Sequence, residues 1–224
     1  MGSIVNRRRV MSSEIKIPYD RVEYLESTGT QWIDTGIKFD TTKHGLFVDG
    51  IFINDLSGIR TIAGCWEGSF DINHLSCAIG GNYENCYFSL PILSGFRGGS
   101  AGKKIAEPGV RNMVGFINHG IENDVLKATL FVNGVETKVN VNNPYVGISA
   151  QTYPLGGVKY AGTNNIRELV HFLWYGFKFY EYDNLIMDLI PVRVGTTGYM
   201  YDKVSGKLFG NAGTGAFVLG PDVK

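Results

Sequence analysis

The stretch "GYMYDKVSGKLFGNAGTGAFVLGPDV", residues 198–223, decides the fold class of this chain. Aromatic and aliphatic residues alternate with polar ones in short runs, and six glycines separate those runs. A period of two is typical of β-strands, and glycine supplies the backbone conformations that tight turns require. The glycines do not have the spacing of a phosphate-binding loop. The stretch therefore predicts the closing β-meander of an all-β domain.

The rest of the chain continues this pattern towards the N-terminus and contains no long segment with helical periodicity. Asn133-Gly134 lies between two β-rich arms, which is a strong hairpin signal because a type I′ turn needs positive φ at both central residues. Many short strands separated by turns predict an antiparallel β-sandwich or jelly roll. The expected strands are 44–53, 60–66, 84–90, 110–119, 126–141, 153–158, 168–183, 185–194, 198–202, 206–210 and 215–220.

Composition narrows the class of protein further. The chain has 224 residues, 44% of them hydrophobic, and a formal net charge of zero. A neutral chain is not expected to coat nucleic acid over its whole surface, so no specific nucleic-acid partner is predicted. No apolar run reaches membrane-spanning length, and the N-terminus lacks the apolar segment of a signal peptide. We therefore expect no membrane partner and synthesis in the cytoplasm.

The first 18 residues differ from the remainder. Arg7, Arg8, Arg9 and Lys16 stand against the single acidic residue Glu14. This arm has too little apolar material to fold alone, whereas residues 19–224 can form one sandwich domain. The arm is either a loose extension or a docking arm whose arginines meet carboxylates or phosphates on a partner.

Three segments resemble one family. "VEYLESTGTQWIDTGIKFD" (22–40), the segment 110–139 with its "LFVNG" hairpin, and the closing segment 189–223 are similar to concanavalin A-like and laminin-G-like jelly-roll domains. Such domains are common in bacteriophage structural proteins from gut communities. The resemblance implies a virion protein without enzymatic activity, namely a head fibre, a capsid decoration protein or a tail component. It would attach to capsid or tail proteins through its N-terminal arm and present the jelly roll, with host glycans as a further partner.

The alternative is a glycan-binding module of a gut bacterial cell-surface protein. The missing secretion and anchor signals count against it. In either case the first and last strands of a sandwich often lie side by side. We therefore expect residues 30–36 to lie near residues 207–210 or 216–220.

An aromatic run over residues 171–182 predicts contacts on both faces of one strand. One face fills the core. The other face must be covered by a loop of the same chain, a neighbouring subunit or a ligand, because large apolar patches on monomers are uncommon. We expect a homo-oligomer, and the analogy with virion fibres favours a trimer.

Catalytic motifs are incomplete. Sandwich-fold glycosidases carry three alternating carboxylates in an E-x-D-x-E strand, and two of those carboxylates perform the acid–base and nucleophilic steps. Here Glu181 and Asp183 are followed by Leu185, so the third carboxylate is missing. The sequence therefore predicts that the protein is not an enzyme.

Glycan-binding sites combine exposed aromatic rings with amides and carboxylates. Trp66 has such neighbours, whereas Trp32 and Trp174 lie in strands that favour the core. Trp66 itself is either a core or interface residue or a ligand contact. The predicted glycan-binding residues are Trp66, Glu67, Asp71, Asn73, Asn82 and Tyr83.

No cofactor is predicted, and calcium is the single alternative that the sequence leaves open. The four histidines have no metal-binding spacing, but Asn54, Asp55, Asp71 and Asn73 lie in loops that together could supply the oxygens that calcium prefers. Three cysteines, Cys65, Cys77 and Cys86, lack zinc-type spacing and are expected to be reduced and buried, with one disulfide as the alternative.

Overall fold

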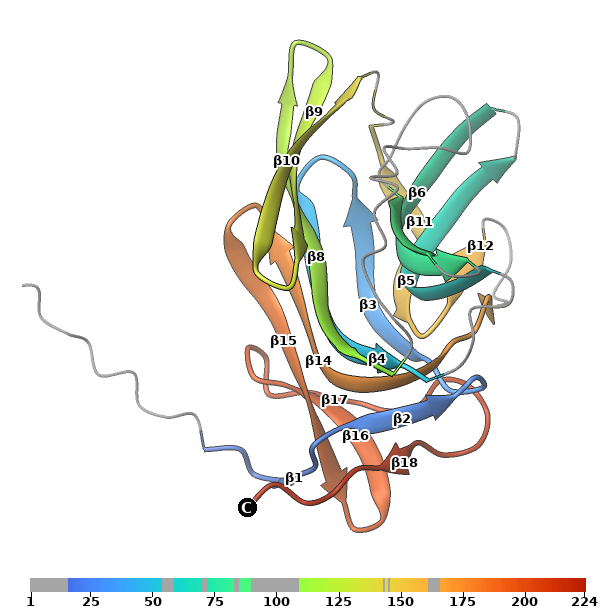
Figure 1. Cartoon of the computed structure of the whole chain (residues 1–224), viewed down its shortest axis with the longest axis vertical. Coiled ribbons are helices and arrows are strands. Elements are labelled where there is room, and N and C mark those ends of the chain that lie inside the picture. The colour runs from blue at the N-terminus through green and yellow to red at the C-terminus, as the bar shows by residue number, and fades with distance from the viewer. Residues whose placement is uncertain are drawn as a thin grey trace, which may run out of the picture.

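Two β-sheets pack face to face in the computed structural model (Figure 1), which describes residues 16–53, 59–69, 72–82, 85–89, 109–142, 144, 146–160 and 166–224. These residues form the strands β1 to β18 and no helix. Consequently, no helix among them could cross a membrane. The architecture is an all-β, mainly antiparallel sandwich of the jelly-roll type, and the predicted fold class is confirmed.

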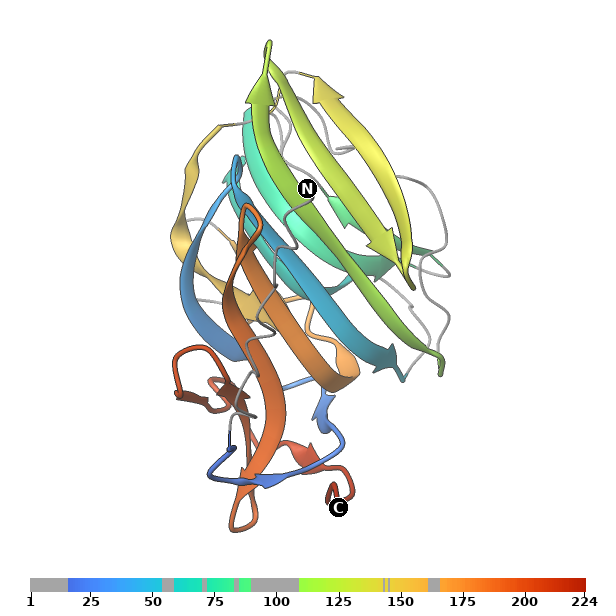
Figure 2. The same cartoon turned by 90° about the vertical axis from the view of Figure 1, so that its left-hand side faces the viewer.

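The larger sheet lies on the left of Figure 1, faces the viewer in Figure 2, and contains both the first strand and the last. Its central strand β14 (His171–Glu181) pairs with β4 (His44–Phe52) along one edge, and with β15 (Asn184–Val194) and β2 (Leu25–Thr28) along the other. In spatial order the main strands are β10 (Val135–Asn142), β9 (Val125–Val132), β8 (Arg111–Glu122), β4 (His44–Phe52), β14 (His171–Glu181), β15 (Asn184–Val194), β16 (Thr197–Asp202) and β17 (Leu208–Phe209). The short strands β1 (Asp20–Arg21), β2 (Leu25–Thr28) and β18 (Val218–Leu219) complete it.

The smaller sheet covers the opposite side of the core and contains one parallel pair, β12 with β5. Its strands are β13 (Ile166–Arg167), β12 (Val158–Tyr160), β5 (Ile59–Ser69), β11 (Ile148–Leu155), β3 (Ile33–Asp40), β6 (Ile72–Asn82) and β7 (Asn85–Ser89). Sequence analysis missed β6, because "INHLSCAIGGN" is rich in residues with low strand propensity. Pairing with β5 and β7 on both edges overrides that local preference.

The core is aromatic, and β14 supplies much of it. Phe172 and Trp174 are buried, and so are Phe177 and Phe179, although the two pairs differ in parity along the strand. The register with β4 shifts between Trp174 and Gly176, which is a β-bulge that lets both pairs face the same core. The aromatic run is thus divided by the bulge rather than by simple alternation.

The predicted hairpin is present between β9 and β10. Val132 pairs with Val135, and Asn133 and Gly134 have φ angles of 48° and 83°. Positive φ at both central residues is the type I′ conformation that the Asn-Gly sequence favours. This prediction is confirmed.

The closing stretch contains a hairpin but not a full meander. β16 pairs with β17, and Asp202 accepts hydrogen bonds from the backbone N–H groups of Val204 and Ser205 at the tip between them. The last strand, β18, then leaves this hairpin and pairs with β2 from the start of the chain. The prediction of a closing meander is therefore wrong for its last strand, which the opening motif captures instead.

The opening and closing motifs are joined by side-chain hydrogen bonds. The buried Gln31 accepts from the Thr28 N–H at 2.8 Å and donates to the Ala216 carbonyl at 2.9 Å. The Asn211 side chain accepts from the Trp32 N–H at 3.1 Å. The expected proximity of residues 30–36 to the closing segment is confirmed, and we call this set of contacts the terminal clasp.

Candidate functional site

The chain segment that follows the N-terminal arm is fixed to the last residues of the sequence. Val22 and Asp222 form a β-bridge, the Glu23 N–H donates to the Pro221 carbonyl at 2.8 Å, and the Val223 N–H donates to the Arg21 carbonyl at 2.9 Å. An open groove of about 610 Å³ lies beside this junction. It is lined by Lys16, Ile17, Tyr19, Asp20, Arg21, Arg193, Asp222, Val223 and Lys224.

Electrostatic contacts organise this groove. The Arg193 guanidinium binds both carboxylate oxygens of Asp222, at 2.8 and 3.0 Å, and approaches Asp20 at 3.2 Å. The hydrogen bond from Arg193 lowers the pKa of Asp222, so that carboxylate is charged at neutral pH. Tyr19 packs edge-on against Tyr201 with ring centroids 5.5 Å apart. The segment that directly follows the arm is therefore a fixed part of the domain.

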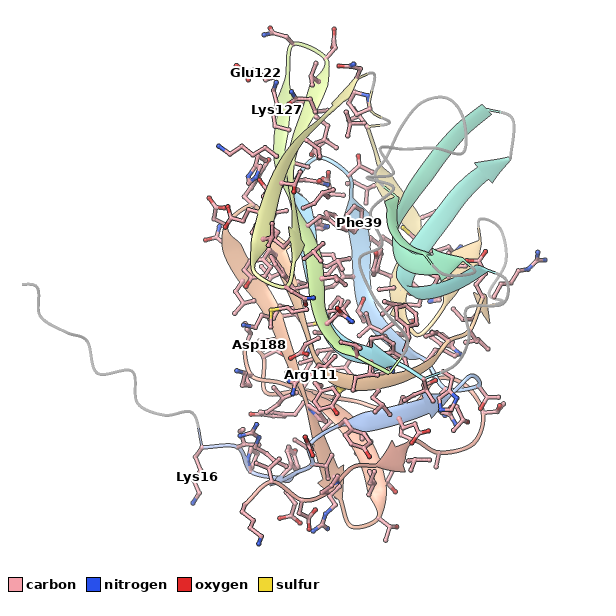
Figure 3. All side chains as sticks on the ribbon, viewed as in Figure 1. Lys16, Phe39, Arg111, Glu122, Lys127 and Asp188 are labelled. Atoms are coloured by element: carbon pink, nitrogen blue, oxygen red, sulfur yellow. The ribbon has the colours of Figure 1, made fainter. Side chains whose placement is uncertain are left out.

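Of the predicted docking residues, the structure describes one. Lys16 is exposed and lines the groove, and Figure 3 shows it at the lower end of the molecule. Arg7, Arg8 and Arg9 lie outside the described residues. The docking role of the arm remains a prediction.

The four predicted glycan-binding residues that the structure describes are distributed along one hairpin of the smaller sheet. Trp66 and Glu67 lie in β5, and Asn73 lies near the same end of β6, because Glu67 pairs with Leu75. Asn82 is at the opposite end of β6. Asn82 is nine positions after Asn73, which is about 30 Å along a strand.

One sugar ring therefore cannot contact both asparagines. Asp71 and Tyr83 lie outside the described residues, as do the calcium candidates Asn54 and Asp55. Within the described ranges no group of three or more histidine, cysteine or acidic side chains could hold a metal ion. Calcium binding thus remains a prediction.

Sequence analysis missed a charged cluster on the outer face of the smaller sheet. Trp32, expected in the core, is only half-buried, and the Lys159 ammonium lies 5.1 Å from its ring centroid. The same ammonium donates to Asp34 at 2.7 Å and to the Thr152 hydroxyl, and its side chain is only 8% exposed. The strands β3, β11 and β12 bring these residues together. No spacing in the sequence indicates this cluster, because it depends on strand order.

The Asp34–Lys159 pair should make stability depend on pH. Burial acts to raise the pKa of Asp34, but hydrogen bonds from Lys159, Thr152 and the Gly36 N–H outweigh it, so the pKa lies below the ordinary value of 3.8. The stability that this pair contributes is therefore present above about pH 4 and is lost as the pH falls through the lowered pKa.

Lys159→Met should lower the free energy of unfolding by about 1 kcal/mol at pH 7, because Asp34 is partly exposed and solvent screens the pair. The deficit should shrink below pH 3. Urea unfolding followed by tryptophan fluorescence between pH 2 and 7 measures both effects. Lys138→Met, at an exposed position of β10, is the control and should change little. A deficit independent of pH would assign the loss to packing alone.

The two carboxylates of the incomplete glycosidase motif, Glu181 and Asp183, have different surroundings. Glu181 forms an ion pair with Lys43, and this hydrogen bond lowers the pKa of Glu181. A general acid for sugar cleavage needs a raised pKa instead. Asp183 is an exposed residue of the β14–β15 hairpin. These two residues therefore do not form a catalytic acid–base pair.

The structure describes the side chain of one of the three cysteines. Cys65 is buried, and its backbone pairs with that of Cys77 across β5 and β6.

The aromatic run lies in β14, and the outer face of this strand is partly covered by side chains of its own sheet. The Tyr180 ring lies 5.5 Å from that of Phe47, and the Tyr175 ring lies 5.5 Å from that of Tyr24, measured between ring centroids.

Comparisons with known proteins show no family for this chain. No protein-family model matches the chain, and no curated protein matches it. Among solved structures, the crystal structure of alginate lyase vAL-1 from Chlorella virus is similar, with a TM-score of 0.43 and 9% sequence identity. The similarity covers 64% of this chain and 73% of that chain.

That neighbour is an enzyme, which contradicts the prediction that this protein is not one. We therefore withdraw the prediction that this protein has no enzymatic activity. The likeness is at the level of the fold and assigns neither a substrate nor a reaction to this chain. The chain shares the jelly-roll sandwich fold with the family that its sequence resembles.

Proposed function

We propose that this protein is a structural component of a bacteriophage particle, such as a head fibre, a capsid decoration protein or a tail component. Its N-terminal arm attaches to capsid or tail proteins, and its jelly-roll domain is displayed outward. The sequence resemblance suggests this role. The observation in the structure that supports it is that the segment following the arm pairs with the C-terminal residues at one end of the sandwich.

This geometry separates an attachment end from a display end. Lys16, near the end of the arm, lies at the lower end of the molecule, whereas Glu122 and Lys127 of the β8–β9 hairpin lie at the opposite end (Figure 3). The bridge between Val22 and Asp222 fixes the attachment end. A partner bound by the arm therefore leaves the far hairpins and the outer sheet faces accessible.

The chemistry of the arm suits an acidic partner surface. Three consecutive arginines offer planar, multiply donating groups that bind carboxylates or phosphates bidentately. Arg193 shows this mode within the groove, where it holds Asp222 through two hydrogen bonds. We infer that the arm docks by the same kind of contact, and that several copies assemble on the particle, with a trimer as the favoured state.

Deleting residues 1–15 should abolish incorporation into particles while leaving the domain folded. Every described residue is retained in this variant, so the terminal clasp and the core are unaffected. Incorporation is measured by mass spectrometry of purified particles made in a complementation system, and folding by the melting temperature of the purified variant.

The matched control replaces Arg7, Arg8 and Arg9 with serine and keeps the arm's length. This triple variant should lose most incorporation if charge drives docking. Normal incorporation of the deletion variant would exclude attachment through the arm. A particle-free host that displays the protein on its own surface would instead favour the bacterial glycan-binding module.

A further inference from the structure

Beside the bulge of β14, the partner strand along one edge changes from β2 to β15. We call this point, on the outer face of the larger sheet, the fork. Along one edge of β14, β2 pairs with residues 171–174 and β15 pairs with residues 177–181. Tyr175 and Gly176 fall between these two ladders. Tyr175 is the extra residue of the bulge, since Trp174 pairs with Gly50 and Gly176 pairs with the neighbouring Asp49. Bulges often re-aim side chains in this way.

Four side chains from different segments meet at this fork. The Arg111 guanidinium of β8 lies over the Tyr175 ring, 3.8 Å from its centroid. It also binds Asp49 of β4 bidentately, with both N–O distances 2.7 Å. The Tyr24 ring lies 5.5 Å from that of Tyr175, tilted by 49°. We call these four residues the tyrosine fork, and Figure 3 labels its Arg111.

The closing segment of the chain holds Tyr24 in place at the fork. Gly220 of the closing segment leaves no room for a side chain, because an added Cβ would lie 2.9 Å from the Tyr24 ring. The Gly220 N–H also donates to the Tyr24 carbonyl at 2.9 Å. Tyr24 is thus held against the C-terminal segment, and Tyr175 is held by the bulge. The two rings form a preorganised platform that needs no rearrangement to receive a ligand.

The platform remains partly open to solvent. Both tyrosine rings are half-buried, and the Arg111 side chain is 51% exposed. Among the described residues, neither phenolic hydroxyl has a hydrogen-bond partner, and Nη1 of Arg111 makes no bond to Asp49. Burial raises the pKa of Tyr175, so its hydroxyl stays protonated and can donate at neutral pH.

These features fit one chemical class of ligand. Tilted aromatic rings offer a surface to the apolar face of a sugar, and the hydroxyls, guanidinium and carboxylate at their edge can exchange hydrogen bonds with sugar hydroxyls. The Arg111–Asp49 pair cancels its own charges, which removes the advantage that an unpaired arginine would give to an acidic sugar. A neutral sugar therefore suits the fork better than a uronate.

We propose that the tyrosine fork, formed by Tyr24, Asp49, Arg111 and Tyr175, is a binding site for neutral saccharides. The site is separate from the predicted Trp66 region, which lies in the smaller sheet. The inference deepens the proposed display role by naming a ligand class, and it rests on that role only for its biological meaning. Binding itself is a property of the purified full chain.

The test is an array of neutral hexose and N-acetylhexosamine oligosaccharides, with alginate oligosaccharides as the acidic arm, followed by calorimetric titration of each binder. The wild-type chain should bind neutral oligosaccharides. Tyr175→Ala should weaken binding at least tenfold, which corresponds to the loss of one aromatic stacking contact. Arg111→Lys should also weaken it, because lysine cannot reproduce the bidentate contact with Asp49.

Control variants make each outcome decisive. Tyr182→Ala alters an exposed tyrosine just beyond β14 and should leave binding unchanged. If Tyr175→Ala does not fold, Tyr24→Ala and Arg111→Lys carry the test. No binding to neutral oligosaccharides, binding of alginate alone, or loss with Trp66→Ala but not with the fork variants would overturn the proposal. Particle incorporation is measured separately, so failure of the arm and failure of the fork are distinguishable.

Discussion

Gly50→Ala should destabilise the domain by about 3 kcal/mol, the upper range for overpacking a core. Gly50 lies in the core-facing row of β4, and an added Cβ would lie 2.0 Å from Cε1 of Phe172 and 2.5 Å from the Leu173 carbonyl oxygen. The carbonyl belongs to the paired strand and cannot move without breaking the ladder. The melting temperature should fall by about 10 °C. Differential scanning calorimetry of the purified variant measures this shift.

Two variants test the assigned cause. Gly176→Ala is the matched control, because its Cβ would meet only the Leu189 carbonyl oxygen at 3.5 Å, an ordinary contact. It should change the melting temperature little. Adding Phe172→Leu to Gly50→Ala should cost less than the sum of the single changes, since the ring would no longer block the Cβ. Additive losses would show that the Phe172 ring is not the obstacle.

Gln31→Leu should lower the free energy of unfolding by about 2 kcal/mol through loss of the terminal clasp. Leucine has a similar volume but leaves the Thr28 N–H and the Ala216 carbonyl without their partner. Both hydrogen bonds are part-buried, and each contributes about 0.5–1.5 kcal/mol. Chemical denaturation measures the loss. Hydrogen exchange should show where stability is lost. The Gly220 N–H, which donates to the Tyr24 carbonyl beside the terminal clasp, should exchange faster in the variant.

Thr30→Val is the control for this clasp. The Thr30 hydroxyl donates to the Thr214 carbonyl at 3.1 Å, but this bond is exposed, so water can replace it. The variant should lose less than about 0.5 kcal/mol. Equal losses in Gln31→Leu and Thr30→Val would show that burial of Gln31 contributes nothing.

The sequence predicted those parts of the fold that depend on local rules. Asn133-Gly134 has only a few accessible turn geometries, so the β9–β10 hairpin followed from two residues. The turns around Gly206 and Gly195 were predictable for the same reason, and both glycines have positive φ. The contact between the opening and closing segments was predictable because sandwich topology brings terminal strands together.

The candidate sites depended on non-local facts and were largely out of reach. Tyr175 faces outward because a bulge interrupts β14, and no residue in "HFLWYGFKFY" marks the bulge uniquely. Lys159 is buried against Trp32 because β12 lies near β3 in space. Arg111 and Asp49 belong to β8 and β4, whose register is set over the whole length of the pair.

The sequence by itself therefore determined an all-β sandwich and its principal turns, since short-range alternation and turn chemistry specify these features. It also determined the meeting of the opening and closing segments, because sandwich topology brings terminal strands together. Only the tertiary structure decided that β18 joins β2, that the aromatic run changes face at Tyr175, and that two tyrosines, an arginine and an aspartate share one surface. The physical reason is that strand order, register and bulges are fixed by long-range pairing and core packing, which no local window of sequence contains.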